Sequence, residues 1–116
     1  MDAGDEYIAF ARSADQGSGV EIRVNFGLFA GREATPAELD ELARRLLHDV
    51  ERVTVVSERR YEVSERVEAS VHQVRIEIAC ELVPDDIVDA ARLEGRLLTL
   101  SEAWATACIA ERHAPV

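Results

Sequence analysis

The sequence predicts an α+β fold in a single domain over residues 1–116, with the element order ββαββα. Apolar residues alternate with polar ones in the segments expected to be strands, and they recur at helical spacing in two further segments. A chain of 116 residues has the size of one domain and buries roughly two-thirds of its unfolded surface. We therefore expect a four-stranded, mainly antiparallel sheet with two helices on one face.

The first two strands form a predicted hairpin. A short strand over 7–12 leads into a loop at 15–19, whose two glycines allow the positive φ used in hairpin connections. The next strand has the clearest pattern in the chain, because every second residue is apolar: Val20, Ile22, Val24, Phe26 and Leu28. Gly31 ends this strand.

A helix is predicted over 36–50. Thr35 is a good N-cap, Pro36 suits the first helical position, and Glu38 completes a capping box. Leucines then recur at helical spacing, with charged residues on the opposite side.

Residues 52–82 predict a hairpin of two long strands with its turn near Ser64-Glu65. Pairing about that turn places Val53 opposite Ile76 and Val55 opposite Val74, on the core face. A helix is the alternative for part of this segment, because five of its Val and Ile residues also share a helical face. The abundance of Val and Ile favours strands.

The last segment predicts a helix over 85–112 that begins after Pro84. At 1.5 Å per residue it would be about 42 Å long, whereas a compact domain of this size is roughly 35 Å across. We expect the helix either to break, at Gly95 or at 99–102, or to extend beyond the body. Trp104 is expected in the core, and it becomes an interface anchor if the helix extends.

The core face of the 52–82 hairpin becomes polar halfway along its length. The predicted pairing brings Ser57 opposite His72, with Arg59, Tyr61, Ser70 and Glu68 further out on the same face. A solvated arm explains this pattern most simply. The functional alternative is a cleft for a small anion or polar ligand, formed by Arg59, Tyr61, Glu68 and His72.

The opposite face of the same hairpin is apolar where a solvent-facing side would be polar. We expect a second copy of the chain to cover this strip, because two-fold dimers are the commonest arrangement for such a surface. The strip consists of Val56, Val67, Ala69 and Val71.

The charge of the chain favours a protein partner. Its 23 acidic and 13 basic residues give a net charge of −10, and no basic block is present. We therefore expect neither nucleic acid nor a membrane as partner, whereas a basic protein is a suitable one. Every basic residue is an arginine, which excludes chemistry that depends on lysine, such as Schiff-base formation.

The residues form no catalytic constellation and show no metal-ligand spacing, and we expect no cofactor. The acidic N-terminus lacks the layout of a secretory signal, so we expect a cytoplasmic protein. Cys80 and Cys108 both lie in apolar stretches and are expected to be buried free thiols. The sequence favours a non-enzymatic interaction module, acting as a homodimer with an acidic surface for a protein partner. The alternative is a small-molecule-binding protein or minor enzyme that uses the cleft around His72.

Overall fold

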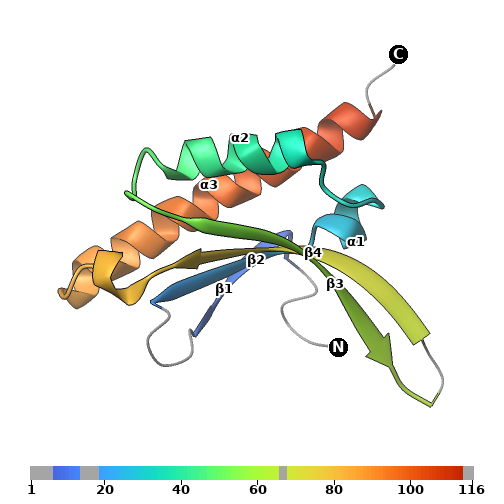
Figure 1. Cartoon of the computed structure of the whole chain (residues 1–116), viewed down its shortest axis with the longest axis horizontal. Helices are drawn as coiled ribbons and strands as arrows, with labels where there is room; N and C mark the ends of the chain where they lie inside the picture. Colours follow the sequence, from blue (N-terminus) through green and yellow to red (C-terminus); the bar gives the residue numbers. More distant parts are fainter. Residues whose placement is uncertain (1–6, 14–18, 66–67, 114–116) are drawn as a thin grey trace.

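Four antiparallel strands form one sheet in the order β1-β2-β4-β3 (Figure 1). The computed structural model describes residues 7–13, 19–65 and 68–113, and all statements about structure refer to these residues. The strands are β1 (Ala9–Ser13), β2 (Val20–Val24), β3 (Thr54–Val63) and β4 (Glu68–Ile78). The α+β fold and the four-stranded antiparallel sheet predicted from the sequence are confirmed.

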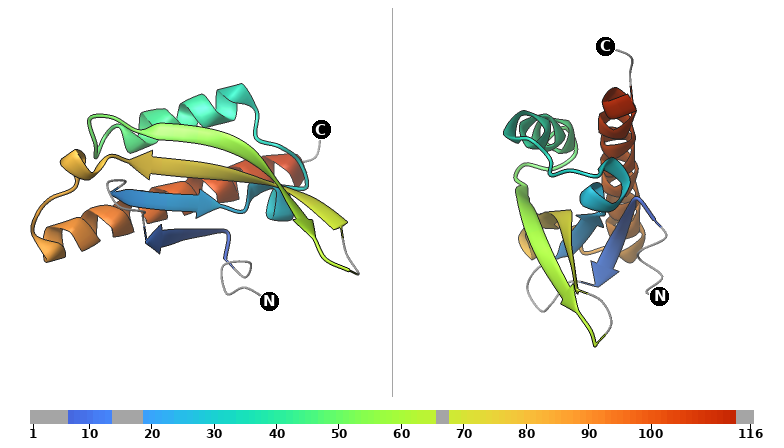
Figure 2. Two further views of the ribbon diagram at one scale, coloured as in Figure 1. Left: turned by 60° about the horizontal axis from the view of Figure 1, so that its bottom comes forward. Right: turned by 90° about the vertical axis from the view of Figure 1, so that its right-hand side faces the viewer.

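Two long helices, α2 (Pro36–Leu46) and α3 (Ile87–His113), lie on the same side of the sheet (Figure 2). Helix α3 contacts β1 and β2, and α2 contacts β3. The structure adds two short elements that the sequence did not predict. These are the one-turn helix α1 (Phe26–Ala30) and the 3₁₀ turn η2 (Cys80–Leu82). The predicted burial of Cys80 is wrong, because this turn follows the end of β4 and leaves the thiol exposed, whereas Cys108 is buried in α3.

The hydrophobic core lies between the sheet and the two long helices. The inward positions of β2 and β4 alternate with outward ones, as the period of two requires. Complete burial of one large apolar side chain, from a strand or a helix, contributes on the order of 1.5–3 kcal/mol to the free energy of unfolding. The largest of them are Trp104, Phe26, Ile22, Leu42, Leu46, Ile76, Ile78 and Leu97.

The predicted extension of β2 to Leu28 is wrong. The strand ends at Val24, and Phe26–Ala30 form α1, which stops at Gly31 in the left-handed conformation (φ 72°). The helical turn carries Phe26 into the core, where its ring lies 5.3 Å from that of Trp104. Gly27 lets this turn lie directly on β4, because a Cβ there would stand 2.7 Å from the backbone nitrogen of His72.

The 52–82 segment forms a strand hairpin, as predicted, but its register differs by two residues. Val55 lies opposite Ile76, and Arg59 lies opposite His72. The pairing therefore centres one residue later than Ser64-Glu65. Because the shift is even, each side chain keeps the face that the sequence predicts for it.

Helix α3 is continuous through Gly95 and through residues 99–102. Its 27 residues correspond to about 40 Å. The molecule accommodates this length because its shape is flat, with extents of 43 × 41 × 21 Å. The estimate of roughly 35 Å assumed a more spherical body.

The predicted capping box at the start of α2 is confirmed. The amide of Glu38 donates to Thr35 Oγ1 over 3.2 Å, and the amide of Thr35 donates to Glu38 Oε1 over 2.9 Å. Both carboxylate oxygens of Glu38 also accept from the guanidinium of Arg32, at 2.7 and 2.8 Å. This bidentate contact is the main reason why the pKa of Glu38 is lowered to about 2.

Candidate functional site

The outer halves of β3 and β4 project beyond the rest of the sheet (Figure 1). Strand β2 pairs with β4 only from Val74 to Ile78, so residues 59–63 of β3 and 68–72 of β4 pair only with one another. We call these two segments the arm. All four residues of the predicted ligand site belong to it.

His72 lies at the base of the arm, beneath α1. It is half-buried and stands directly opposite Arg59. Gly27 lies close to the backbone and the Cβ atom of His72, and the Nδ1 atom of His72 is buried without a hydrogen-bond partner in the described part of the chain.

Arg59 and Tyr61 form the exposed part of the predicted ligand site. The Nη1 atom of Arg59 donates to the hydroxyl of Tyr61 over 3.3 Å. This bond, with a smaller contribution from the charge of Glu33, raises the pKa of Arg59. Ser57 Oγ, one step inward on the same face, donates to Glu33 Oε1 over 3.4 Å.

The structure therefore brings together three of the four predicted ligand residues: Arg59, Tyr61 and His72. Glu68 pairs with Val63 in the backbone ladder, and its side chain lies outside the described structure. Because Arg59 and Tyr61 are exposed, this face of the arm is open to solvent.

The predicted apolar strip falls on the sheet face away from the helices. Val56 and Val71 are half-buried there, and the Glu58–Gln73 pair lies between them. Ala69 belongs to β4, although its side chain is not described, and Val67 lies outside the described residues.

Trp104 is not part of any surface. Its side chain is 1% exposed and packs in the core between α2 and α3.

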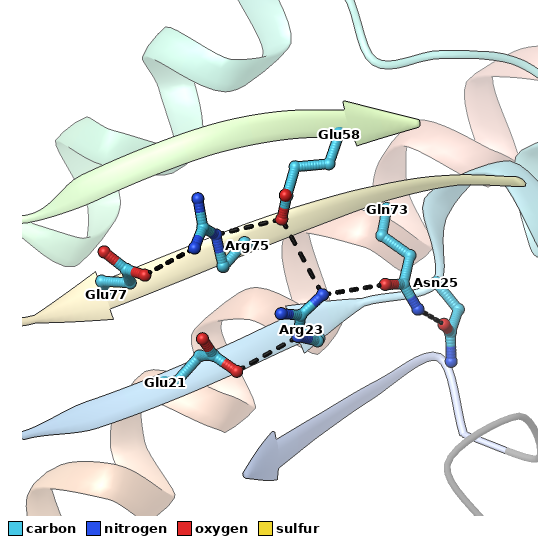
Figure 3. Close-up of polar contacts among 7 residues, drawn as sticks. All are labelled: Glu21, Arg23, Asn25, Glu58, Gln73, Arg75 and Glu77. Atoms are coloured by element: carbon cyan, nitrogen blue, oxygen red, sulfur yellow. Dashed lines mark hydrogen bonds and ion pairs between the residues drawn. The ribbon is translucent and has the colours of Figure 1, made fainter. Parts of the chain in front are cut away.

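The same outer sheet face carries a chain of charged and amide side chains (Figure 3). Glu58 bridges two arginines, at 3.0 Å from Arg75 and 3.8 Å from Arg23. Arg23 also contacts Glu21 at 3.1 Å, and Arg75 contacts Glu77 at 2.9 Å. These contacts make the uncovered face polar, as an antiparallel sheet open to water requires.

Five of the exposed large apolar residues belong to the arm, to α1 or to the segment before β1, and the arm and α1 lie at the same end of the molecule (Figure 1). Tyr61 and Val63, on the helix-side face of the arm, are 66% and 72% exposed. The start of β1 joins them there, because the carbonyl of Tyr7 accepts from Asn25, directly before α1. The arm-end residues are Tyr7, Leu28, Phe29, Tyr61 and Val63.

Tyr61 is the one arm-end residue that the sequence predicts as a site residue. Leu28 and Phe29 escape prediction because Leu28 fits the alternation of β2. The signal that could have identified a helical turn is the pair Gly27 and Gly31, together with the adjacent apolar residues Leu28 and Phe29. A strand with one buried face would not place two large apolar residues in succession.

Within the described residues, no group of three or more His, Cys, Asp or Glu side chains is placed to hold a metal ion. None of the described helices is long and apolar enough to cross a membrane. Comparison of the chain with models of known families, with curated proteins and with solved structures finds no match in any of the three.

Proposed function

We propose that this protein is a non-enzymatic protein–protein interaction module that associates as a homodimer through its arm. The observation that carries the proposal is the outer edge of β3. This ten-residue strand pairs on one side only, with β4, among the described residues. A long edge strand offers unpaired N–H and C=O groups to another strand, and here it also carries the exposed Tyr61 and Val63.

A second copy of the chain supplies a matching edge. Two β3 strands can pair antiparallel about a two-fold axis perpendicular to the sheet. The two sheets would then form one continuous sheet with all long helices on the same face. Pairing of this kind covers Tyr61 and Val63 of both copies, since cross-strand neighbours shield each other from water.

The acidic surface of such a dimer is suited to a basic protein partner, because opposite charge accelerates and orients encounter. We place this function in the cytoplasm. The free thiols Cys80 and Cys108 are in keeping with a reducing compartment.

Light scattering after size-exclusion chromatography tests the proposal. The wild type is expected to be a dimer, and the double variant Tyr61→Glu/Val63→Glu a monomer with unchanged far-ultraviolet circular dichroism. The matched control is Ile87→Glu/Val88→Glu, which places the same charges on two exposed residues at the start of α3. The control is expected to stay dimeric. A monomeric wild type, or an arm variant that stays dimeric, would contradict the proposal.

The second candidate function is a small-molecule-binding protein or minor enzyme that uses Arg59, Tyr61 and His72. The Nδ1 atom of His72 favours it, because this atom is buried without a hydrogen-bond partner among the described residues, and buried polar atoms normally have one. Native mass spectrometry of protein purified from its source distinguishes the two functions. A small bound mass that disappears in His72→Ala would support this candidate, and protein without such a mass would count against it.

A further inference from the structure

A cavity of about 600 Å³ that is wide open to solvent, with all its lining residues exposed except Leu100, lies between the turn after α2 and the middle of α3. Its volume falls within the range of small-molecule sites, about 300–1,000 Å³. It is remote from the arm, since its walls come from α3 and from the turn after α2. The lining residues are Asp49, Arg92, Gly95, Arg96, Thr99 and Leu100.

Arg92 has no ion pair or hydrogen bond with any described residue. Each of the other arginines whose side chains are described has at least one such contact. This is unusual in a chain where acidic residues outnumber basic ones by 23 to 13. Arg92 therefore offers the cavity a guanidinium group that no carboxylate of the described chain neutralises.

Arg96 stands one helical turn from Arg92, on the same wall. Its Nε atom donates to Asp49 Oδ1 over 3.1 Å. Two like charges at this spacing repel each other, and Asp49 offsets only one of them. An anion between the two guanidinium groups would remove the repulsion.

Gly95 lies between the two arginines and has no structural role in the described chain. It has no positive φ, and apart from its chain neighbours and the adjacent backbone of α3 itself, no atom of the described chain lies within 4 Å of the position that a Cβ would take. Glycine weakens the interior of a helix, so its presence needs another explanation. It leaves the cavity open down to the backbone of α3.

We propose that this cavity binds a small organic oxyanion, a carboxylate or a phosphate ester. Its charged group lies between Arg92 and Arg96, beside the hydroxyl of Thr99, and its apolar part lies on Leu100. The planar guanidinium fork fits both kinds of oxyanion. The net negative charge of the chain does not prevent binding, because salt screens exposed charges beyond about 10 Å.

The test is a ¹H–¹⁵N NMR titration of the full chain with four probes: acetate, benzoate, inorganic phosphate and phenyl phosphate. We expect benzoate or phenyl phosphate to shift the amide signals of residues 92–100 at millimolar concentration. Which of the two binds more tightly identifies the oxyanion. Weaker binding by acetate and inorganic phosphate is expected, because they lack a group to contact Leu100.

Three variants complete the titration. Arg92→Ala is expected to weaken binding about tenfold or more, the effect of losing one charge-assisted hydrogen bond. Gly95→Leu is expected to abolish binding without lowering the melting temperature, since it fills open space. The control is Arg44→Ala, which removes an exposed arginine of α2 that pairs with Asp40. This variant should bind the probes as tightly as the wild type does. The proposal is overturned if no probe shifts these amides, if the simple ions bind as well as the aromatic ones, or if Gly95→Leu binds normally.

Discussion

The indole Nε1 of Trp104 donates a hydrogen bond to the backbone carbonyl of Glu38 over 2.9 Å. This contact joins the middle of α3 to the first turn of α2. The centroid of the Phe26 ring lies 5.3 Å from that of the indole, and the guanidinium of Arg32 lies over the Phe26 ring, 5.2 Å from its centroid. The three helices therefore meet at one junction, which holds the helical layer together.

Replacing Trp104 with Phe is expected to destabilise this junction by about 2 kcal/mol, because it removes a buried hydrogen bond and leaves a cavity. Urea unfolding followed by far-ultraviolet circular dichroism measures the change in stability. Tryptophan fluorescence cannot follow unfolding of this variant, because Trp104 is the only tryptophan. Tyr7→Phe is the control. It alters an exposed aromatic residue and should change stability by less than about 0.5 kcal/mol. Equal effects of the two substitutions would contradict the role assigned to Trp104.

The contact between Arg32 and Glu38 makes stability depend on pH. The pKa of Glu38 is about 2 in the folded protein against an ordinary value of 4.5. Because the folded value is the lower one, the carboxylate stabilises the fold above pH 4.5, and this contribution is lost as the pH falls from 4.5 to about 2. Partial exposure of Arg32 screens the interaction, so we expect a loss of about 2 kcal/mol.

Urea unfolding at neutral pH and at pH 3 tests this expectation. Glu38→Gln should lower stability at neutral pH and reduce the difference between the two conditions. Glu41→Gln is the control, because Glu41 forms an exposed pair with Arg45 one turn along α2. If Glu41→Gln reduces the pH dependence as much as Glu38→Gln does, the Arg32–Glu38 contact is not its source.

The same substitution at two helical glycines is expected to have opposite effects. Gly95→Ala should stabilise the protein by about 1 kcal/mol, because alanine is the better helix former and the space is open. Gly27→Ala should destabilise it by about 1–3 kcal/mol, since its Cβ would meet the backbone of His72 at 2.7 Å. Melting temperatures of the two variants measure the difference. A stabilising Gly27→Ala would mean that α1 does not lie against β4.

The sequence predicts the architecture because local patterns determine most of it. Alternation identifies β2 and β4, and the capping box locates the start of α2 within a residue. The α1 turn could not be predicted in the same way. Phe26 and Leu28 continue the alternation of β2, which outweighs the local signal of Gly27 and Gly31. The contact of Phe26 with Trp104, far along the chain, favours a helical turn over a longer strand.

The candidate site was predicted in part for a related reason. The faces of Arg59, Tyr61 and His72 follow from the period of two, which a register shift of two residues leaves unchanged. The identity of direct neighbours does not survive such a shift. His72 lies opposite Arg59 rather than Ser57, and Gly27 of α1 lies against its backbone, which no pattern within the hairpin could reveal.

The charged network on the outer sheet face provides the last prediction. Glu58 links Arg23 of β2 and Arg75 of β4, and the side chains of all three are at least two-thirds buried. Glu58→Ala is expected to cost about 1–2 kcal/mol, because it leaves two partly buried guanidinium groups without their shared partner.

Asp40→Ala is the matched control. It changes the net charge equally but breaks an exposed pair with Arg44, and should cost less than about 0.5 kcal/mol. Urea unfolding measures the loss of stability in both variants. The larger loss in Glu58→Ala should persist in high salt, because salt screens partly buried ion pairs only weakly. Equal costs would mean that the network contributes no more than an ordinary surface ion pair.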